Sequence, residues 1–193
     1  MTKELEIEFK NMLTREEYKR LLTHFHLAAD DVKTQENYYF DTADFKLKEA
    51  KSALRIRKKL ESFECTLKIP APEGNFEITD PLNALQAEAI ISGQSFEAAE
   101  VYAALQKLQV EPSQLIMIGK LMTHRIELGY KDGLLVLDHS EYQNTADYEV
   151  EFEVQDAKLG QQQFLEFLQL QKIPVRPADK KIARFMKAAK SGI

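Results

Sequence analysis

Glutamates occupy every second position in two segments of this sequence. They are Glu4, Glu6 and Glu8 near the amino terminus and Glu149, Glu151 and Glu153 nearer the carboxyl terminus. In a β-strand such residues share one face about 7 Å apart, where like charges repel one another unless a cation lies among them. Carboxylate groups without histidine or cysteine beside them favour hard cations. The two rows therefore predict a site for Mg²⁺ or Mn²⁺.

Basic residues follow the same alternation in other segments. Arg55, Arg57 and Lys59 alternate in one of them, and Lys10 directly extends the first row of glutamates. A row of positive side chains is stabilised by an anion, and arginine and lysine commonly bind phosphate oxygens. Acidic and basic rows in one small protein together indicate a site for a metal ion and a polyphosphate.

Eight strands are expected to carry these side chains, because period-two alternation and aromatic or β-branched residues mark eight segments. The expected strands are residues 4–10, 35–42, 52–60, 63–69, 115–118, 121–130, 134–140 and 148–154. Five of them have one face that is almost wholly charged and an opposite face that is apolar.

The charged faces have two possible explanations. For a single strand, the charged face could be the solvent-exposed side of an open antiparallel sheet. A closed barrel explains all five strands at once, because its charged faces would line the interior and its apolar faces would lie under helices. We therefore predict an α+β fold, built on a closed eight-stranded antiparallel β-barrel with a charged interior and helices packed outside.

Apolar residues at helical spacing predict helices in three regions. One helix follows the first strand, behind a capping sequence at residues 14–17. A helical insert is expected at about residues 80–112, and helices at about 158–190 complete the chain. Because no linker or internal repeat divides the sequence, residues 1–193 are expected to form a single domain. The insert could cover an opening of the barrel or mediate dimerisation, so a homodimer is a possible assembly.

Composition and charge exclude several classes of protein. The 193 residues are 44% hydrophobic and 30% charged, which is typical of an ordinary globular protein. A net charge of −5 argues against a protein that coats nucleic acid or an anionic membrane surface. The amino terminus lacks a signal peptide, and no apolar run reaches the roughly 18 residues needed to cross a bilayer. We expect a cytoplasmic protein.

The cysteine and the histidines give weaker signals. Cys65 cannot form an internal disulfide, and its alternation with apolar neighbours predicts a buried structural thiol. His24, His26, His124 and His139 lack the sequence spacing of a zinc site, so no metal role is expected for them.

Eight short motifs resemble those of the CYTH-domain, or triphosphate tunnel metalloenzyme, superfamily, and in particular its small stand-alone bacterial members. In order they are E-x-E-x-K at 6–10, YYFDT at 38–42, LRIR at 54–57, TLK at 66–68, THR at 123–125, LD at 137–138, EFE at 151–153 and KIAR at 181–184. The resemblance extends from about residue 4 to residue 184. It implies an eight-stranded tunnel in which basic residues bind a triphosphate and acidic residues bind a divalent metal.

The resemblance also implies roles for individual residues. The expected ligands of the phosphate oxygens are Lys10, Arg55, Arg57, Lys68, Arg125, Lys181 and Arg184. The expected ligands of Mg²⁺ or Mn²⁺ are Glu6, Glu8, Asp138, Glu151 and Glu153. Glu6, Glu8 and Lys10 are the expected catalytic residues, with either glutamate as a base. Two departures from the family pattern are the extra glutamates at 4 and 149, which could join the metal site, and Lys180, where the family often has serine.

Three functions fit these residues. The first is metal-dependent hydrolysis of inorganic tripolyphosphate or of a small organic triphosphate such as thiamine triphosphate, by charge neutralisation and positioning. The second is a non-catalytic sensor that binds polyphosphate or a nucleotide. The third is a class IV adenylate cyclase, which would need a nucleotide pocket that is not legible in the sequence. The expected partner is in each case a small polyanion rather than nucleic acid or a membrane.

Overall fold

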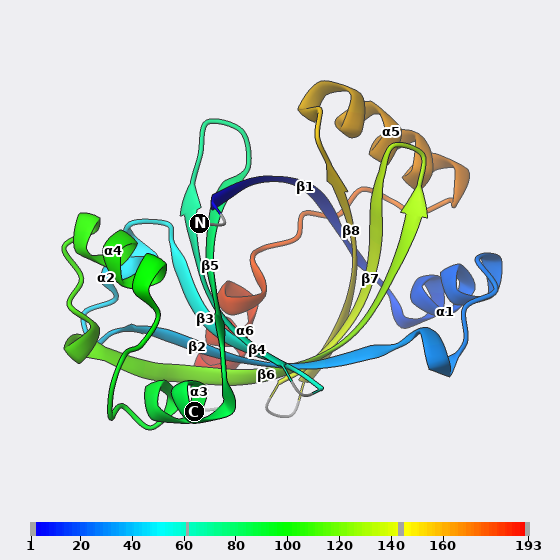
Figure 1. The fold of residues 1–193 in the computed structure, drawn as a ribbon. Helices are drawn as coiled ribbons and strands as arrows, with labels where there is room; N and C mark the ends of the chain where they lie inside the picture. Colours follow the sequence, from blue (N-terminus) through cyan, green and yellow to red (C-terminus); the bar gives the residue numbers. More distant parts are fainter. Residues whose placement is uncertain (1–2, 61, 143–144, 192–193) are drawn as a thin grey trace. The chain divides into compact units, whose positions relative to one another are not determined.

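The computed structural model describes residues 3–60, 62–142 and 145–191 (Figure 1). The ends of the expected domain, residues 1–2 and 192–193, lie outside the described residues, as do 61 and 143–144. The strands are β1 (Lys3–Leu13), β2 (Lys33–Thr42), β3 (Ala53–Lys59), β4 (Ser62–Pro70), β5 (Asn75–Leu82), β6 (Leu115–Tyr130), β7 (Gly133–Tyr142) and β8 (Thr145–Val154). The helices are α1 (Arg15–His24), α2 (Lys46–Glu49), α3 (Ala84–Ile91), α4 (Ala99–Lys107), α5 (Ala157–Leu170) and α6 (Lys181–Ser191), with short 3₁₀ turns η1 (Ala29–Asp31) and η2 (Pro112–Gln114).

The strands form a closed barrel in the order β1-β5-β4-β3-β2-β6-β7-β8. The predicted fold class, a closed eight-stranded antiparallel barrel with helices, is thereby confirmed. Charged residues on several strands are buried, among them Arg57, Arg125, Asp138 and Glu149. Burial of charged side chains excludes the alternative of a solvent-facing charged sheet at these positions.

The expected strands differ from the observed strands in two places. Residues 75–82 form β5, which pairs with β4 along its whole length, although the sequence pattern placed no strand there. Pro81 and the mixture of acidic and apolar residues weaken the strand signal, and proline is tolerated because it lies next to the end of the strand. Residues 115–118 and 121–130, expected as separate strands, are one continuous β6 that runs through Gly119. The strand count was therefore right because one omission and one false break compensated.

The chain divides into two compact units, which comprise the described parts of residues 1–5 with 35–121 (unit 1) and of residues 6–34 with 122–193 (unit 2). In unit 1, β2, β3, β4 and β5 pair consecutively, and α3 and α4 pack on β4 and β5. The core of this unit includes Leu54, Ile56, Cys65, Leu67 and Leu105, all of them buried. The prediction that Cys65 is a buried thiol is confirmed.

In unit 2, β1, β8, β7 and β6 pair consecutively, and α1 and α5 pack on β8. Their apolar core includes Leu21, Leu137 and Phe152. A Cβ atom at Gly160 of α5 would lie 2.5 Å from the side chain of Val154, so the glycine allows this helix to approach β8 closely. The opposite face of the same strands is left to the charged residues.

The predicted helix start after β1 is also observed. Thr14 caps α1 by accepting a hydrogen bond from the backbone of Glu17, and the Glu17 side chain accepts one from the backbone of Thr14. Within the part of the chain that the structure describes, no helix is both long and apolar enough to cross a membrane.

Candidate active site

The charged residues of unit 2 are brought together by strand register. Arg125 of β6 lies opposite Asp138 of β7, which lies opposite Glu149 of β8. Lys10 of β1 lies opposite Glu151 of β8. Because alternate residues of a strand share a face, these five side chains are placed on one face of the unit 2 sheet.

Arg125 and Asp138 form a buried, bidentate ion pair. Arg125 donates from Nε to Asp138 Oδ1 at 2.9 Å and from Nη2 to Asp138 Oδ2 at 2.6 Å. Its Nη2 also donates to Glu151 Oε2 at 2.8 Å. Burial by itself would raise the pKa of Asp138, but the charges of Lys181 and Arg125 hold the pKa of that carboxyl well below its usual range. The Asp138 carboxylate is therefore ionised at neutral pH.

Lys181, the first residue of α6, reaches the same carboxylates. Its Nζ lies 2.7 Å from Asp138 Oδ2 and 2.8 Å from Glu151 Oε1, and it also contacts Glu149. Burial, together with the like charges of Arg125 and Lys10, lowers the pKa of Lys181, and the Asp138 carboxylate opposes that shift.

The segment before α6 is anchored to β1, which fixes where Lys181 begins the helix. The backbone N–H of Arg176 donates to Asn11 Oδ1 at 2.5 Å, and Asn11 Nδ2 donates to the carbonyl of Pro174 at 3.1 Å. The guanidinium of Arg176 pairs with both carboxylate oxygens of Glu17 at 2.8 and 3.0 Å. These contacts explain how a residue far along the chain is held beside strand residues.

Lys10 lies between two carboxylates. Its Nζ is 2.9 Å from Glu8 Oε1 and 3.3 Å from Glu151 Oε1. Although burial alone would lower it, the charges of Glu151 and Glu8 raise the pKa of Lys10. Lys10 is therefore positively charged, and its side chain bridges Glu8 of β1 and Glu151 of β8.

Glu153 of β8 is a partly buried carboxyl that lies close to other carboxylates. Burial raises its pKa to about 7, and the nearby carboxylates of Glu6, Glu151 and Glu8 contribute to the rise, while Arg125 opposes it. Glu8 and Glu153 are direct neighbours across β1 and β8. A cation placed among these carboxylates would relieve their repulsion.

Arg184 joins the network one turn into α6. It donates from Nε to Asp147 Oδ2 at 2.7 Å and from Nη1 to Glu149 Oε2 at 2.8 Å. Tyr142 donates its hydroxyl to the same Asp147 oxygen at 2.5 Å. Asp147 was not predicted from the sequence, although it extends the alternation of acidic residues on β8 by one step.

The carboxylates fit a divalent cation. The ligand oxygens of Asp138, Glu149 and Glu151 all lie within 4.8 Å of one another, and the three residues are buried. A donor set made only of oxygen atoms is the set that Mg²⁺ and Mn²⁺ prefer. The structure therefore groups Glu149, left open by the sequence, with the predicted ligands Asp138 and Glu151, whereas Glu4 is exposed.

The predicted phosphate ligands of unit 1 form a second charged cluster. Lys68 Nζ lies 2.5 Å from Glu77 Oε1, and Arg55 Nη2 lies 3.9 Å from the same oxygen. Arg57 donates from Nε to Asn37 Oδ1 at 3.1 Å, and its Nη1 lies 3.4 Å from Glu64 Oε1. Arg55, Arg57 and Lys68 are thus brought together on β3 and β4.

Glu77 is one residue of this cluster that was not predicted from the sequence. Although burial would raise it, the charges of Lys68 and Arg55 lower the pKa of Glu77. Glu77 lies directly opposite Lys68 on β5, the strand that was not predicted. Alternation of Phe76 and Ile78 around it is the signal that could have found it.

Comparisons with known proteins identify the family of this chain. The sequence matches the CYTH domain family over residues 4–186. A protein of Bacillus subtilis (strain 168) named "Putative triphosphatase YjbK" is 41% identical over 193 residues, which is all of both chains. A crystal structure from Bacillus halodurans, described as a "putative adenylate cyclase", superposes with a TM-score of 0.93 at 42% identity, covering 96% of this chain and 99% of that one.

A more distant structure shares the fold. It is a "putative adenylyl cyclase" from Hippeastrum, described as having a dominant triphosphatase activity, with a TM-score of 0.74 at 21% identity. The superposition covers 95% of this chain and 96% of that chain. The resemblance drawn from the sequence motifs is confirmed, and the chain belongs to the CYTH domain family.

Proposed function

We propose that this protein is a divalent-metal-dependent triphosphatase that hydrolyses inorganic tripolyphosphate or a small organic triphosphate such as thiamine triphosphate. The observation that carries the proposal is the buried group of Asp138, Glu149 and Glu151, with Arg125 and Lys181 among the carboxylates. Burying this much charge is costly unless each group is paired. A metal ion and a polyanion would add both signs of charge to such a network.

We assign the divalent cation, Mg²⁺ or Mn²⁺, to the carboxylates of unit 2. The proposed ligands are Glu6, Glu8, Asp138, Glu151 and Glu153, with Glu149 added because it shares the cluster. When bound, the cation would supply positive charge against phosphate oxygens and make a bound water more acidic. Burial raises the pKa of Glu153, and the carboxylates of Glu6, Glu151 and Glu8 raise it further, so a cation bound beside them would be favoured.

The basic residues would bind and orient the triphosphate. In unit 2 these are Lys10, Arg125, Lys181 and Arg184, and in unit 1 they are Arg55, Arg57 and Lys68. Each of these cations already contacts carboxylates in the structure. Substrate binding would exchange these contacts for phosphate oxygens, which suits hydrolysis because positioning and charge neutralisation supply most of the catalysis of phosphoryl transfer.

In this proposal Glu6 or Glu8 acts as the general base that accepts a proton from the attacking water. Glu8 is the better placed, because Lys10 lies 2.9 Å from its carboxylate and would connect it to the phosphate ligands. A carboxylate in this position would accept the proton as the water oxygen attacks the terminal phosphorus.

A class IV adenylate cyclase is the second candidate, because the Bacillus halodurans protein, 42% identical, is described as a "putative adenylate cyclase". A cyclase would remove a proton from a ribose hydroxyl of ATP and release pyrophosphate. A non-catalytic polyphosphate or nucleotide sensor is the third, and it would bind its ligand without turnover.

One substrate panel separates these functions. The purified protein is incubated with tripolyphosphate, thiamine triphosphate or ATP, with Mg²⁺ or Mn²⁺, and orthophosphate, pyrophosphate and cyclic AMP are quantified. We expect orthophosphate release that chelator abolishes and that Glu8→Gln lowers by about 100-fold or more, the size expected for loss of a main electrostatic contribution. The matched control is Glu88→Gln, an equally conservative change at an exposed position on α3. Cyclic AMP with pyrophosphate would support the cyclase, and tight binding without any product would support the sensor.

A further inference from the structure

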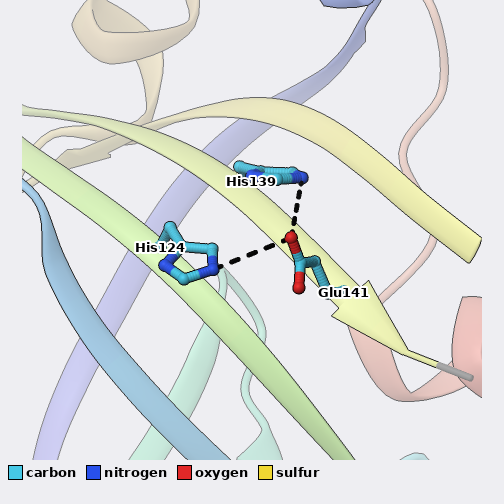
Figure 2. A group of neighbouring side chains, drawn as sticks. All are labelled: His124, His139 and Glu141. Atoms are coloured by element: carbon cyan, nitrogen blue, oxygen red, sulfur yellow. Dashed lines mark ion pairs between the residues drawn. The ribbon is translucent and has the colours of Figure 1, made fainter.

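A second group of potential metal ligands lies on the other face of the unit 2 sheet. His124 of β6 is directly opposite His139 of β7, and Glu141 follows His139 two residues later on the same strand (Figure 2). Because His124 precedes Arg125 and His139 follows Asp138, strand alternation turns the histidines away from the face that carries those charged residues. The group is therefore separate from the candidate active site.

The three side chains converge on one point. His124 Nε2 lies 3.8 Å and His139 Nε2 lies 3.6 Å from the same oxygen, Glu141 Oε1. Figure 2 shows both rings presenting a nitrogen to this carboxylate. Ligand atoms around a zinc ion with bonds of about 2.1 Å lie roughly 3.4 Å apart. Shifts of a few tenths of an ångström at the exposed Glu141 would bring its oxygen into that range.

Neighbouring residues hold both rings in place. Thr34 Oγ1 is 3.0 Å from His124 Nδ1, and a proton on Nδ1 that is donated to this hydroxyl leaves the Nε2 lone pair for a metal ion. The ring of His139 stacks on Tyr148 with 4.6 Å between centroids and 12° between planes. Ligands on paired strands with such supports are held more rigidly than ligands on loops.

Two imidazole nitrogens and one carboxylate oxygen are a donor set suited to borderline transition-metal ions and poorly suited to Mg²⁺. We propose that His124, His139 and Glu141 form a binding site for a divalent transition-metal ion of the Zn²⁺ type. The site cannot be recognised from the sequence spacing of the histidines, because its ligands come from two different strands, β6 and β7.

The test is calorimetric titration of the full-length protein with ZnCl₂ in buffer with excess Mg²⁺, which competes for the carboxylates of the candidate active site. We expect one Zn²⁺ per chain, bound at least about tenfold more weakly after His124→Ala and after Glu141→Gln. His26→Asn is the matched control, because His26 is an exposed histidine outside the group, in a left-handed conformation that asparagine tolerates. It should bind Zn²⁺ as the unchanged protein does.

A second readout identifies the ligand atoms. Zn²⁺ should shift the Nε2 resonances of His124 and His139 in nitrogen-detected imidazole spectra and leave those of His24 and His26 in place. If His124→Ala disturbs folding, as judged by circular dichroism, Glu141→Gln decides the matter, because the exposed Glu141 is not needed for packing. The proposal is overturned if no Zn²⁺ binds, or if binding is unchanged in both ligand variants.

Discussion

Replacing Asp138 with asparagine tests whether the buried charge network stabilises the fold as its geometry indicates. Asparagine keeps the shape of the side chain and one accepting oxygen, but it turns two donor hydrogens toward Arg125 and Lys181. In the unchanged protein Asp138 is wholly buried, accepts two hydrogen bonds from Arg125 and lies 2.7 Å from Lys181 Nζ.

The expected loss of stability follows from these contacts. Removing one partner of a buried ion pair costs about 3–5 kcal/mol, and a hydrogen bond to a charged group contributes about 1.5–3 kcal/mol. Because Glu149 and Glu151 remain to balance Lys181 and Arg125, we expect the lower end, about 3 kcal/mol. For a chain of this length that corresponds to a melting temperature lower by about 6–12 °C.

The pH dependence gives a sharper test. The pKa of Asp138 lies below its unfolded value of 3.8, so its contribution to stability is complete above that pH and is lost as pH falls through the folded pKa. Urea unfolding in chelator should therefore give the same difference between Asp138→Asn and the unchanged protein at pH 7 and pH 5, and a smaller one below about pH 4. Asp30→Asn, at an exposed position, is the control and should change stability little.

A difference of less than about 1 kcal/mol at pH 7 would show that the Asp138 carboxylate contributes little to the stability of the fold. A difference that has already disappeared at pH 5 would contradict the lowered pKa of Asp138, because it would mean that the carboxyl titrates above its usual range.

Three further predictions concern other parts of the molecule. The pKa of Glu153 is raised to about 7, so the folded protein keeps a proton that the unfolded chain loses above about pH 4.5. The free energy of unfolding in chelator should therefore decrease as the pH rises from 4.5 to 7. Melting temperatures at pH 5 and pH 8 check this, and Glu153→Gln should remove most of the fall. Arg57→Lys keeps the charge but loses the contact from Nε to Asn37, so kcat/KM for the triphosphate should drop by about tenfold or more in steady-state assays, and an unchanged value would contradict a phosphate-binding role. Gly160→Ala should lower stability by about 1–3 kcal/mol in urea unfolding, because its Cβ would lie 2.5 Å from Val154, a stiff side chain; a neutral result would mean that α5 shifts freely on β8.

Much of the fold was predictable because alternation in single strands reports which face is apolar. The segment at residues 4–10 shows this well, since it forms the centre of β1. β5 was not predicted, because Asp80 and Pro81 interrupt the alternation of polar and apolar residues. Its pairing with β4 also depends on residues elsewhere in the chain. Tertiary pairing can stabilise a strand that local preference leaves weak.

The sequence predicted which strand face the charged residues occupy, but it did not predict with which residues they form ion pairs. Alternation groups Glu149, Glu151 and Glu153 on one side of β8, yet it does not say which carboxylate meets Lys181. The structure separates them, because Lys181 contacts Glu149 and Glu151. Glu153 instead interacts with Arg125 and with the carboxylates of β1.

Contacts across strands depend on register, which a single sequence does not specify. The pairing of Lys68 with Glu77 needs the alignment of β4 with β5. The meeting of His124 and His139 needs the alignment of β6 with β7. A one-residue slip would move each side chain to the opposite face, so such clusters become visible only once the register is known.

Release of orthophosphate from tripolyphosphate or thiamine triphosphate is the most direct test of whether the protein is a metal-dependent triphosphatase. The purified protein is assayed with Mn²⁺ or Mg²⁺, with chelator, and beside Glu8→Gln. We expect multiple turnovers with metal, none in chelator, and a rate at least about 100-fold lower in Glu8→Gln. Release at an undiminished rate in chelator and in Glu8→Gln, or no release from either substrate with either metal, would contradict a metal-dependent triphosphatase.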